Sequence, residues 1–280
     1  MEGMKGLITA GIDIGSTTSK AALWIDDHLG ACSIGPSTTN PRATARECYE
    51  KVLQAAGIKA EEVACVFGTG YGRAKVSFAD DNVSELSAHG KGARVLLPSA
   101  CTIIDIGGQD TKVILMDANG EILDFGMNDK CAAGTGRFLE FIARTLGVRV
   151  KDLAKLHAGG SYQPASLSSM CSVFIESEVI NLVNEEVPLA SIVQGMHQSV
   201  AIRVAALVKR LGLVEDVVVT GGVAKNAGVV DELERKLGIR VKTFPDGIDP
   251  QMVGAIGAAV IARQKYLKRS DRQPGKQIKV

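Results

Sequence analysis

Two short polar turns, each directly after an apolar segment, have the composition of phosphate-binding loops. The first turn covers residues 15–19 (GSTTS) and the second covers residues 107–111 (GGQDT). Glycine and hydroxyl residues let backbone N–H groups approach an anion closely. Asp13 and Asp105 precede the two turns, and opposed carboxylates of this kind hold Mg²⁺ and its waters against phosphate oxygens. The two turns therefore predict a site for a polyphosphate and Mg²⁺.

The glycine patterns exclude two familiar nucleotide-binding classes. GxxxxGK[ST], the P-loop pattern, does not occur, and no GxGxxG follows a predicted strand. Each turn alone is also typical of an ordinary hairpin. A third glycine turn, Gly221-Gly222, lies between the apolar segment 217–220 and a predicted helix. The three turns together favour a nucleotide site over three unrelated hairpins.

Cys131 and Cys171 are placed differently from the other cysteines. Each lies in a stretch of small or polar residues that leads into a predicted helix, where the helix N-terminus stabilises a thiolate and favours metal binding. Two cysteines in one chain cannot complete a four-sulfur site, but two chains related by a twofold axis can. The pattern predicts a metal centre shared by two chains, either iron–sulfur or zinc. Each cysteine alone is also compatible with a small buried residue or an incidental thiol.

The remaining cysteines fit a structural role. Cys32, Cys65 and Cys101 lie in apolar, strand-like runs, and Cys48 lies on the apolar face of a predicted helix. No CxxC pair occurs. We therefore expect these four thiols to be free, in the core, and in a reducing compartment.

Composition narrows the class of protein. The 280 residues (29.5 kDa) are enough for two domains, and 46% of them are hydrophobic. The net charge of +1 and the 4% aromatic content give neither a basic field nor stacking platforms for nucleic acid. No apolar run reaches the roughly 18 residues of a membrane span, and the first residues lack a signal-peptide pattern. We expect a cytoplasmic protein that binds neither nucleic acid nor membrane.

The elements that must position these residues are internally repeated. The pattern IDIG followed by Lys20 recurs as IDIG followed by Lys112, at a constant offset of 92 positions. Each copy is typical of three strands joined by two turns. Helical segments alternate with strands farther along the chain, so the sequence predicts a duplicated α/β protein. We expect one lobe from residues 1–98 plus 250–280 and a second, carrying the cluster cysteines, from residues 99–249.

Capping and periodicity predict the boundaries of the later elements. A helix over 44–56 has a Thr44/Glu47 capping box and ends at Gly57. The last helix starts at Asp249 and Pro250, and the basic tail from Lys265 onward is expected to be frayed. Further helices are expected over 136–146, from about 172, and over 189–211 and 226–237, with strands over 217–220 and 239–244.

The three glycine turns resemble the two phosphate motifs and the adenosine motif of the actin, hexokinase and Hsp70 ATPase superfamily. This resemblance implies a two-lobed ATPase with a duplicated RNase H-like fold. It also implies a nucleotide cleft between the lobes, which close over Mg-ATP.

A narrower resemblance is carried by six segments that span residues 6–265: AGIDIGSTTSK, FGTGYGR, TIIDIGGQDTK, MNDKCAAGTGRFLE, SSMCSVFIESEVINL and VVVTGGVAKN. They are similar to the activator components of 2-hydroxyacyl-CoA dehydratases, a family that includes the ATPase subunits of benzoyl-CoA reductase. The resemblance implies a homodimer that shares one 4Fe-4S cluster. It further implies ATP-driven transfer of a single electron from a low-potential donor of ferredoxin or flavodoxin type to a partner iron–sulfur enzyme.

The resemblance also implies roles for individual residues. Cys131 and Cys171 match the cluster ligands, and Asp13 and Asp105 would hold Mg²⁺. Gln109 is a candidate for orienting the attacking water, as a glutamine does in other phosphoryl-transfer sites. The residues expected to bind ATP or ADP are Gly15, Ser16, Thr17, Thr18, Gly107, Gly108, Gln109, Gly134, Gly136, Gly221 and Gly222.

Two other functions are possible for this fold. A sugar or acyl kinase would use a carboxylate such as Asp129 to deprotonate a substrate hydroxyl, but it has no need for Cys131 before a run of small residues. A filament-forming or chaperone-like ATPase would need inserts for which the chain has no room.

Overall fold

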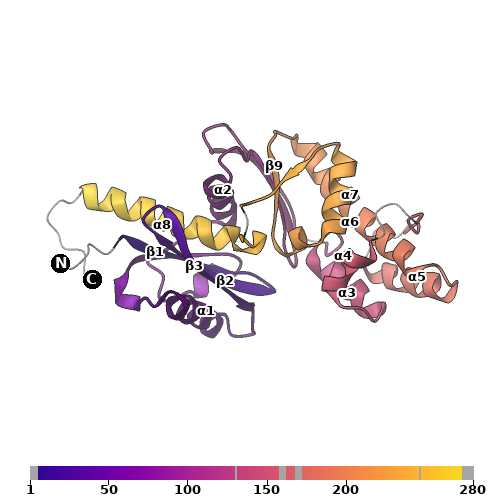
Figure 1. Cartoon of the computed structure of the whole chain (residues 1–280), viewed down its shortest axis with the longest axis horizontal. Coiled ribbons are helices and arrows are strands. Elements are labelled where there is room, and N and C mark those ends of the chain that lie inside the picture. The colour runs from indigo at the N-terminus through magenta and orange to yellow at the C-terminus, as the bar shows by residue number, and fades with distance from the viewer. Residues whose placement is uncertain (1–5, 130, 158–161, 168–171, 246, 273–280) are drawn as a thin grey trace. The chain divides into compact units, whose positions relative to one another are not determined.

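Two compact units make up the chain: residues 1–98 with 245–280 form unit 1, and residues 99–244 form unit 2. The computed structural model describes residues 6–129, 131–157, 162–167, 172–245 and 247–272 (Figure 1). Among these residues, no helix has both the length and the apolar character that a membrane span requires.

Unit 1 is built on a five-stranded mixed sheet with the order β3-β2-β1-β4-β5. The strands β1, β2 and β3 are antiparallel, whereas β4 and β5 run parallel to β1. All residues of β1 are buried, as expected for a strand covered on both faces. The strands are β1 (Ile8–Ile14), β2 (Thr18–Ile25), β3 (His28–Pro36), β4 (Val63–Thr69) and β5 (Asp81–Asn82).

Helices cover both faces of the first sheet. The helix α1 (Pro41–Ala56) packs on one face and α8 (Val253–Arg272) packs on the other, which Figure 1 shows with the strands between them. The helix α2 (Glu85–Leu96) packs against α8. One apolar cluster therefore joins α1 to β1 and β2, and a second joins α8 to the opposite side of β2.

Unit 2 repeats this sheet. Its strand order, read as β8-β7-β6-β9-β10, has the same pattern of antiparallel and parallel pairs as the first sheet. The duplicated α/β fold predicted from the sequence is therefore confirmed. The strands are β6 (Thr102–Ile106), β7 (Thr111–Met116), β8 (Ile122–Asn128), β9 (Val217–Thr220) and β10 (Val241–Lys242).

A longer helical segment distinguishes unit 2 from unit 1. Between β8 and β9 lie α3 (Gly136–Thr145), α4 (Leu153–Leu156), α5 (Ser172–Asn184) and α6 (Leu189–Leu211), and α7 (Ala227–Leu237) follows β9. These helices and one face of the sheet share a single apolar core. Short 3₁₀ turns occur at Ala60–Glu62, Arg73–Lys75, Val150–Asp152, Gly222–Lys225 and Pro250–Met252.

The predicted start of the first helix is wrong, and the strand expected over 239–244 is shorter in the structure, where β10 covers Val241–Lys242. The helix α1 begins at Pro41 rather than near Thr44, because the Asn40 side chain accepts a hydrogen bond from the N–H of Ala43 and caps the helix one turn earlier. Thr44 therefore lies in the first turn, and its hydroxyl donates to the Asn40 carbonyl. The stop at Gly57 is confirmed, with φ +66°.

The segment expected to be a frayed tail is helical as far as Arg272. Lys265 explains much of the difference, because its ammonium pairs with Asp81 at 3.3 Å and lies over the ring of Phe67 at 5.1 Å. A basic residue at this place therefore docks the end of α8 onto β4 and β5. Residues 273–280 lie outside the described residues.

A pair of histidines, one buried and one partly buried, connects three helices of unit 2. His197 of α6 is fully buried, and its Nδ1 lies 3.2 Å from Nδ1 of His157, which ends α4. The Asn226 side chain caps α7 through its Oδ1 and donates from Nδ2 to Nε2 of His197. Burial lowers the pKa of His197 to about 3, and the neighbouring His157 adds to the shift. His197 is therefore neutral in the folded protein at neutral pH.

Unit 1 has a close crossing of two helices at glycine. A Cβ on Gly257 of α8 would overlap the carbonyl oxygen of Ala88 and would lie 2.7 Å from the backbone nitrogen of Gly92, both in α2. Backbones can approach this closely only where no side chain intervenes. The two glycines therefore fix the contact between α2 and α8.

We expect the free energy of unfolding of His197→Gln to fall less than that of the wild type when the pH is lowered. Because the folded-state pKa of His197 lies below the ordinary value of about 6.5, the unfolded chain binds the proton first, and stability is lost as the pH falls below about 6.5. Between pH 7 and pH 5 the wild type should lose about 2 kcal/mol more than the variant, measured by urea unfolding at each pH. The exposed His28→Gln is the control and should behave like the wild type. Equal slopes for the wild type and His197→Gln would contradict the assignment.

Gly257→Ala should destabilise unit 1 although alanine favours helices. The added methyl group has to displace the α2 backbone, and overpacking of this kind costs about 1–3 kcal/mol. Thermal unfolding should show a Tm several degrees lower than that of the wild type. Gln264→Ala, an exposed substitution on the same helix, should leave Tm nearly unchanged. A Tm for Gly257→Ala equal to that of Gln264→Ala would show that the crossing tolerates a side chain.

Candidate functional site

The first phosphate turn joins β1 to β2 and is closed by its own backbone. The N–H of Gly15 donates to the carbonyl of Thr18 at 3.2 Å. Ser37 supports the turn from β3, donating its hydroxyl to the Gly15 carbonyl at 2.7 Å and its N–H to the Thr17 carbonyl at 2.9 Å. The residues Gly15, Ser16, Thr17 and Thr18 are all partly exposed. Hydrogen bonds from Gly15 and Ser37 thus hold the backbone of the turn in shape.

The second phosphate turn has the same geometry. The N–H of Gly107 donates to the Asp110 carbonyl at 2.9 Å, which is the equivalent bond at the offset of the sequence repeat. Gly107 and Gly108 are partly exposed, and Gln109 is exposed. Gln109 therefore lies at the tip of the turn, and its predicted role in orienting water remains a prediction.

Each unit places one aspartate and one lysine behind its turn. Lys20 Nζ lies 3.1 Å from Asp13 Oδ2, and Lys112 Nζ lies 3.7 Å from Asp105 Oδ2. Both carboxylates are only 4% exposed, and buried charges are costly unless they are paired. The conserved spacing of the sequence repeat thus has a structural reason, because each lysine faces its aspartate across an antiparallel strand pair.

The third glycine turn lies at the end of β9. Gly221 has φ +84°, and a Cβ there would lie 2.9 Å from Asp105 Oδ1. A side chain at this position would also meet the β6 backbone, so the chain can turn here only as glycine. Gly222 begins the 3₁₀ turn that leads to the cap of α7 at Asn226. The structure therefore brings Gly221 next to Asp105, within unit 2.

Residues 131–135, which lead into α3 and are called the cysteine loop below, are hydrogen-bonded together with the start of α3 to the second phosphate turn. At the start of α3, the N–H of Gly136 donates to the Gly107 carbonyl at 2.8 Å and the N–H of Arg137 donates to the Gly108 carbonyl at 2.9 Å. The Thr111 hydroxyl donates to the Gly134 carbonyl at 2.8 Å. The predicted nucleotide residues of unit 2 and the segment that follows Cys131 thus form one bonded structure.

Cys131 is the exposed thiol among the cysteines of the described residues. Cys48, Cys65 and Cys101 are buried and Cys32 is partly buried, in agreement with a structural role. Burial raises the pKa of Cys32 to about 11 and that of Cys65 to about 12, which disfavours the thiolate that binds metals. Cys171 lies outside the described residues.

Arg203 is a neighbour of Cys131 that the sequence did not indicate. Burial lowers the pKa of Arg203, and a thiolate at Cys131 opposes that shift. The guanidinium donates to Ser199, and the stem of Arg203 packs at 3.4 Å from the position that a Cβ on Gly134 would take. Arg203 is one residue among the many of the long helix α6, so no sequence pattern distinguishes it. A cation therefore lies close to the predicted metal ligand.

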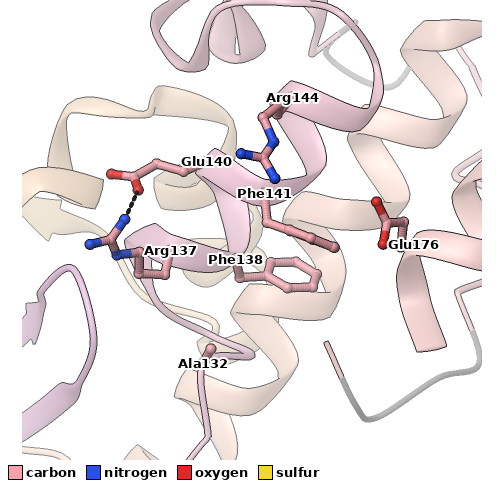
Figure 2. A pocket seen from close by; sticks show the side chains of 7 residues that line it. All are labelled: Ala132, Arg137, Phe138, Glu140, Phe141, Arg144 and Glu176. Atoms are coloured by element: carbon pink, nitrogen blue, oxygen red, sulfur yellow. Dashed lines mark hydrogen bonds and ion pairs between the residues drawn. The ribbon is translucent and has the colours of Figure 1, made fainter. Parts of the chain in front are cut away.

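A cavity of about 710 Å³ opens next to the cysteine loop. Figure 2 shows the rings of Phe138 and Phe141 extending from α3 into this cavity, with Ala132 of the loop and Glu176 of α5 around them. Arg137 and Glu140 form an ion pair at 3.2 Å on its rim. The surface next to Cys131 is thus apolar at its base and charged at its edge.

The described residues contain no group of three or more histidine, cysteine or acidic side chains that could hold a metal ion. Asp13 lies with the first turn in unit 1. The other predicted residues of the described chain lie in unit 2: Asp105, Gly107, Gly108, Gln109, Cys131, Gly134, Gly136, Gly221 and Gly222. Any metal centre at Cys131 therefore requires further ligands from outside these residues.

Comparison with known proteins extends these observations. The profile of the BadF/BadG/BcrA/BcrD ATPase family matches residues 10–262. An (R)-2-hydroxyglutaryl-CoA dehydratase activating ATPase from Acidaminococcus fermentans is 45% identical over 267 residues, covering 94% of this chain and 99% of that protein. The structure of the activator of the 2-hydroxyisocaproyl-CoA dehydratase from Clostridium difficile, with bound ADPNP, superposes with a TM-score of 0.89 at 41% identity, covering 98% of this chain and all of that one.

A more distant structure confirms the fold class. The ROK family glucokinase from Streptomyces griseus has a TM-score of 0.55 at 14% identity, covering 92% of this chain and 99% of that one. At this identity the likeness concerns the fold alone, which is the hexokinase type expected from the glycine turns. The profile match covers nearly the whole chain and includes both phosphate turns and Cys131. The chain therefore belongs to the BadF/BadG/BcrA/BcrD ATPase family.

Proposed function

We propose that this protein is an ATP-dependent activator that passes single electrons to a partner iron–sulfur enzyme of the 2-hydroxyacyl-CoA dehydratase type. The observation that carries this proposal is the bonding of the Cys131 loop to the second phosphate turn, in a chain similar to dehydratase activators along its length. A small-molecule kinase of the same fold has no use for an exposed thiol at this place.

Both phosphate turns serve to bind ATP in this proposal. Both turns are closed by their own backbones, and the similar activator structure from Clostridium difficile contains bound ADPNP. Mg²⁺ commonly uses one or two carboxylates together with phosphate oxygens and waters. Asp13 and Asp105 are suited to that task through the water shell of the ion. Lys20 and Lys112 then hold the carboxylates in place and balance their charge.

The residues around Cys131 fit a 4Fe-4S cluster shared by two copies of the chain. The thiol is exposed, small residues surround it, and the Arg203 guanidinium offsets thiolate charge. The one exposed thiol among the described cysteines of each chain is too few for four cluster ligands, so in this proposal Cys171 and a second chain complete the set. When bound, the cluster supplies one-electron chemistry at low potential, fed by an external donor of ferredoxin or flavodoxin type. Asn128 holds the loop by donating to the Cys131 carbonyl at 3.2 Å.

The hydrogen bonds between turn and helix give ATP a route to the cluster ligands. A phosphate bound at Gly107 and Gly108 would contact the backbone of the turn. The carbonyls of the same two residues accept hydrogen bonds from the first N–H groups of α3. Any shift of the turn must therefore move the start of α3 and the loop that carries Cys131. Nucleotide state can alter the cluster surroundings only through such a difference in contacts.

Anaerobic purification tests the proposal directly. We expect brown protein with about four irons and four sulfides per two chains, and electron transfer to a partner dehydratase only when ATP is present. Cys131→Ser should lose the iron and the visible absorption while remaining folded. Cys32→Ser, at a partly buried thiol in unit 1, should keep both. Iron retained in Cys131→Ser, or a colourless wild type that phosphorylates a small molecule, would contradict the proposal.

Thr111→Val should weaken the link between nucleotide and cluster. The substitution removes the donor to the Gly134 carbonyl and leaves that buried acceptor unpaired. We expect the rate at which an iron chelator removes the cluster to depend on ADPNP in the wild type and to lose most of that dependence in Thr111→Val. Thr9→Val removes a comparable buried bond, to Ala259, and should keep the dependence. An unchanged ADPNP effect in Thr111→Val would exclude this route.

A further inference from the structure

Thr69 is a buried residue whose hydroxyl has no hydrogen-bond partner among the described residues. It ends β4, it is 1% exposed, and its Oγ1 is fully enclosed. In the parallel pairing of β1 and β4 it lies directly beside Asp13. Leaving a buried hydroxyl unpaired is costly, so folded proteins rarely keep one without a reason.

The equivalent residue of unit 2, Thr220, makes a hydrogen bond that Thr69 does not make. Thr220 ends β9, lies beside Asp105 in the parallel pairing of β6 and β9, and donates its hydroxyl to Asp105 Oδ1 at 2.8 Å. A glycine with positive φ follows each threonine, Gly70 at +86° and Gly221 at +84°. The two units therefore share an Asp–Thr–Gly arrangement, but the hydroxyl is bonded to the aspartate in unit 2 alone.

The backbone holds Thr69 firmly at the site. A Cβ on Gly70 would overlap Asp13 and lie 2.6 Å from the Ile14 carbonyl oxygen, and the N–H of Gly72 donates to that same carbonyl at 2.9 Å. The segment after β4 is thus pressed against the end of β1. The unpaired hydroxyl is therefore not a consequence of a loose loop.

A second unpaired hydroxyl lies on the same edge of the sheet. Thr17 belongs to the first phosphate turn, which follows the carboxyl end of β1, and its buried Oγ1 also lacks a partner among the described residues. Thr69 ends β4, which is parallel to β1, so both hydroxyls lie at carboxyl ends of parallel strands, where ligands of α/β sheets bind. Two unpaired hydroxyls beside an ion-paired carboxylate point to a polar ligand at this edge.

We propose that Thr69 is a phosphate-binding residue. Its hydroxyl, which is buried in this structure, would turn about the Cα–Cβ bond and hydrogen-bond an oxygen of the bound polyphosphate. The proposal rests on the proposed function, because it needs ATP to bind at the first turn. It assigns a role to the FGTGYGR segment, which the glycine turns and the cysteine loop leave without one. Asp13 pairs with Lys20 through Oδ2, and the Thr69 hydroxyl makes no hydrogen bond among the described residues.

The first test measures the stability of the protein without nucleotide. Thr69→Val keeps the shape of the side chain and removes an unpaired polar atom, so its Tm should equal or exceed that of the wild type. Thr220→Val removes a donor to a buried carboxylate and should lower Tm by several degrees. A fall in Tm for Thr69→Val as large as that for Thr220→Val would show a structural partner and overturn the proposal.

The second test measures the affinity for ADPNP with Mg²⁺ by calorimetry. A lost hydrogen bond to a charged phosphate should raise Kd about 10-fold or more in Thr69→Val, and Thr69→Ser should restore the wild-type affinity to within about threefold. Equal affinity in the wild type and Thr69→Val would overturn this inference and leave the proposed function standing. A wild type that does not bind ADPNP would overturn both.

Discussion

The hydrogen bonds from the first turn of α3 to the second phosphate turn fix the positions of that turn, of the start of α3 and of the loop before it. A helix begins with N–H groups that lack partners within the helix, and here two of them, at Gly136 and Arg137, are given to Gly107 and Gly108. The turn can therefore neither open nor shift without disturbing the helix. Because Cys131 lies five residues before α3, the same bonds limit where its thiol can go.

The duplicated sheet explains why the turn with its aspartate and lysine occurs twice and the exposed Cys131 thiol does not. Both units place an aspartate, a lysine and a turn at the same edge of a sheet with the same strand order. In unit 1 a single helix, α1, connects the third strand to the fourth. In unit 2 the described part of that connection contains four helices, and the exposed thiol lies near its start. The phosphate turns thus belong to the shared framework, whereas Cys131 belongs to the part that is not shared.

The features that could be predicted depend on residues close together in the sequence. Most of the features that were missed depend on contacts between segments far apart in the sequence. Glycine turns, the spacing of Asp13 and Lys20, and the stop at Gly57 depend on residues close in sequence, so they could be predicted. The start of α1 was placed wrongly because two capping patterns compete within five residues and the Asn40 cap prevails. The position of Thr69 beside Asp13 depends on the register of β1 against β4, which cannot be read from a single sequence. Arg203 likewise meets Cys131 only through the packing of α6.

Charge balance gives a physical reason for the separate positions of the two kinds of site. Asp13 is paired with Lys20, whereas Lys112 lies 3.7 Å from Asp105 and 2.7 Å from Asp110, so each turn has a lysine beside its carboxylates. Cys131 instead has the Arg203 guanidinium as its charged neighbour. A thiolate needs such a cation, and a phosphate would compete for it. In the proposed function, Arg203 stays beside the thiol because it packs against Gly134 and donates to Ser199 on α6, while the carbonyls of Gly107 and Gly108 link the second turn to the start of α3.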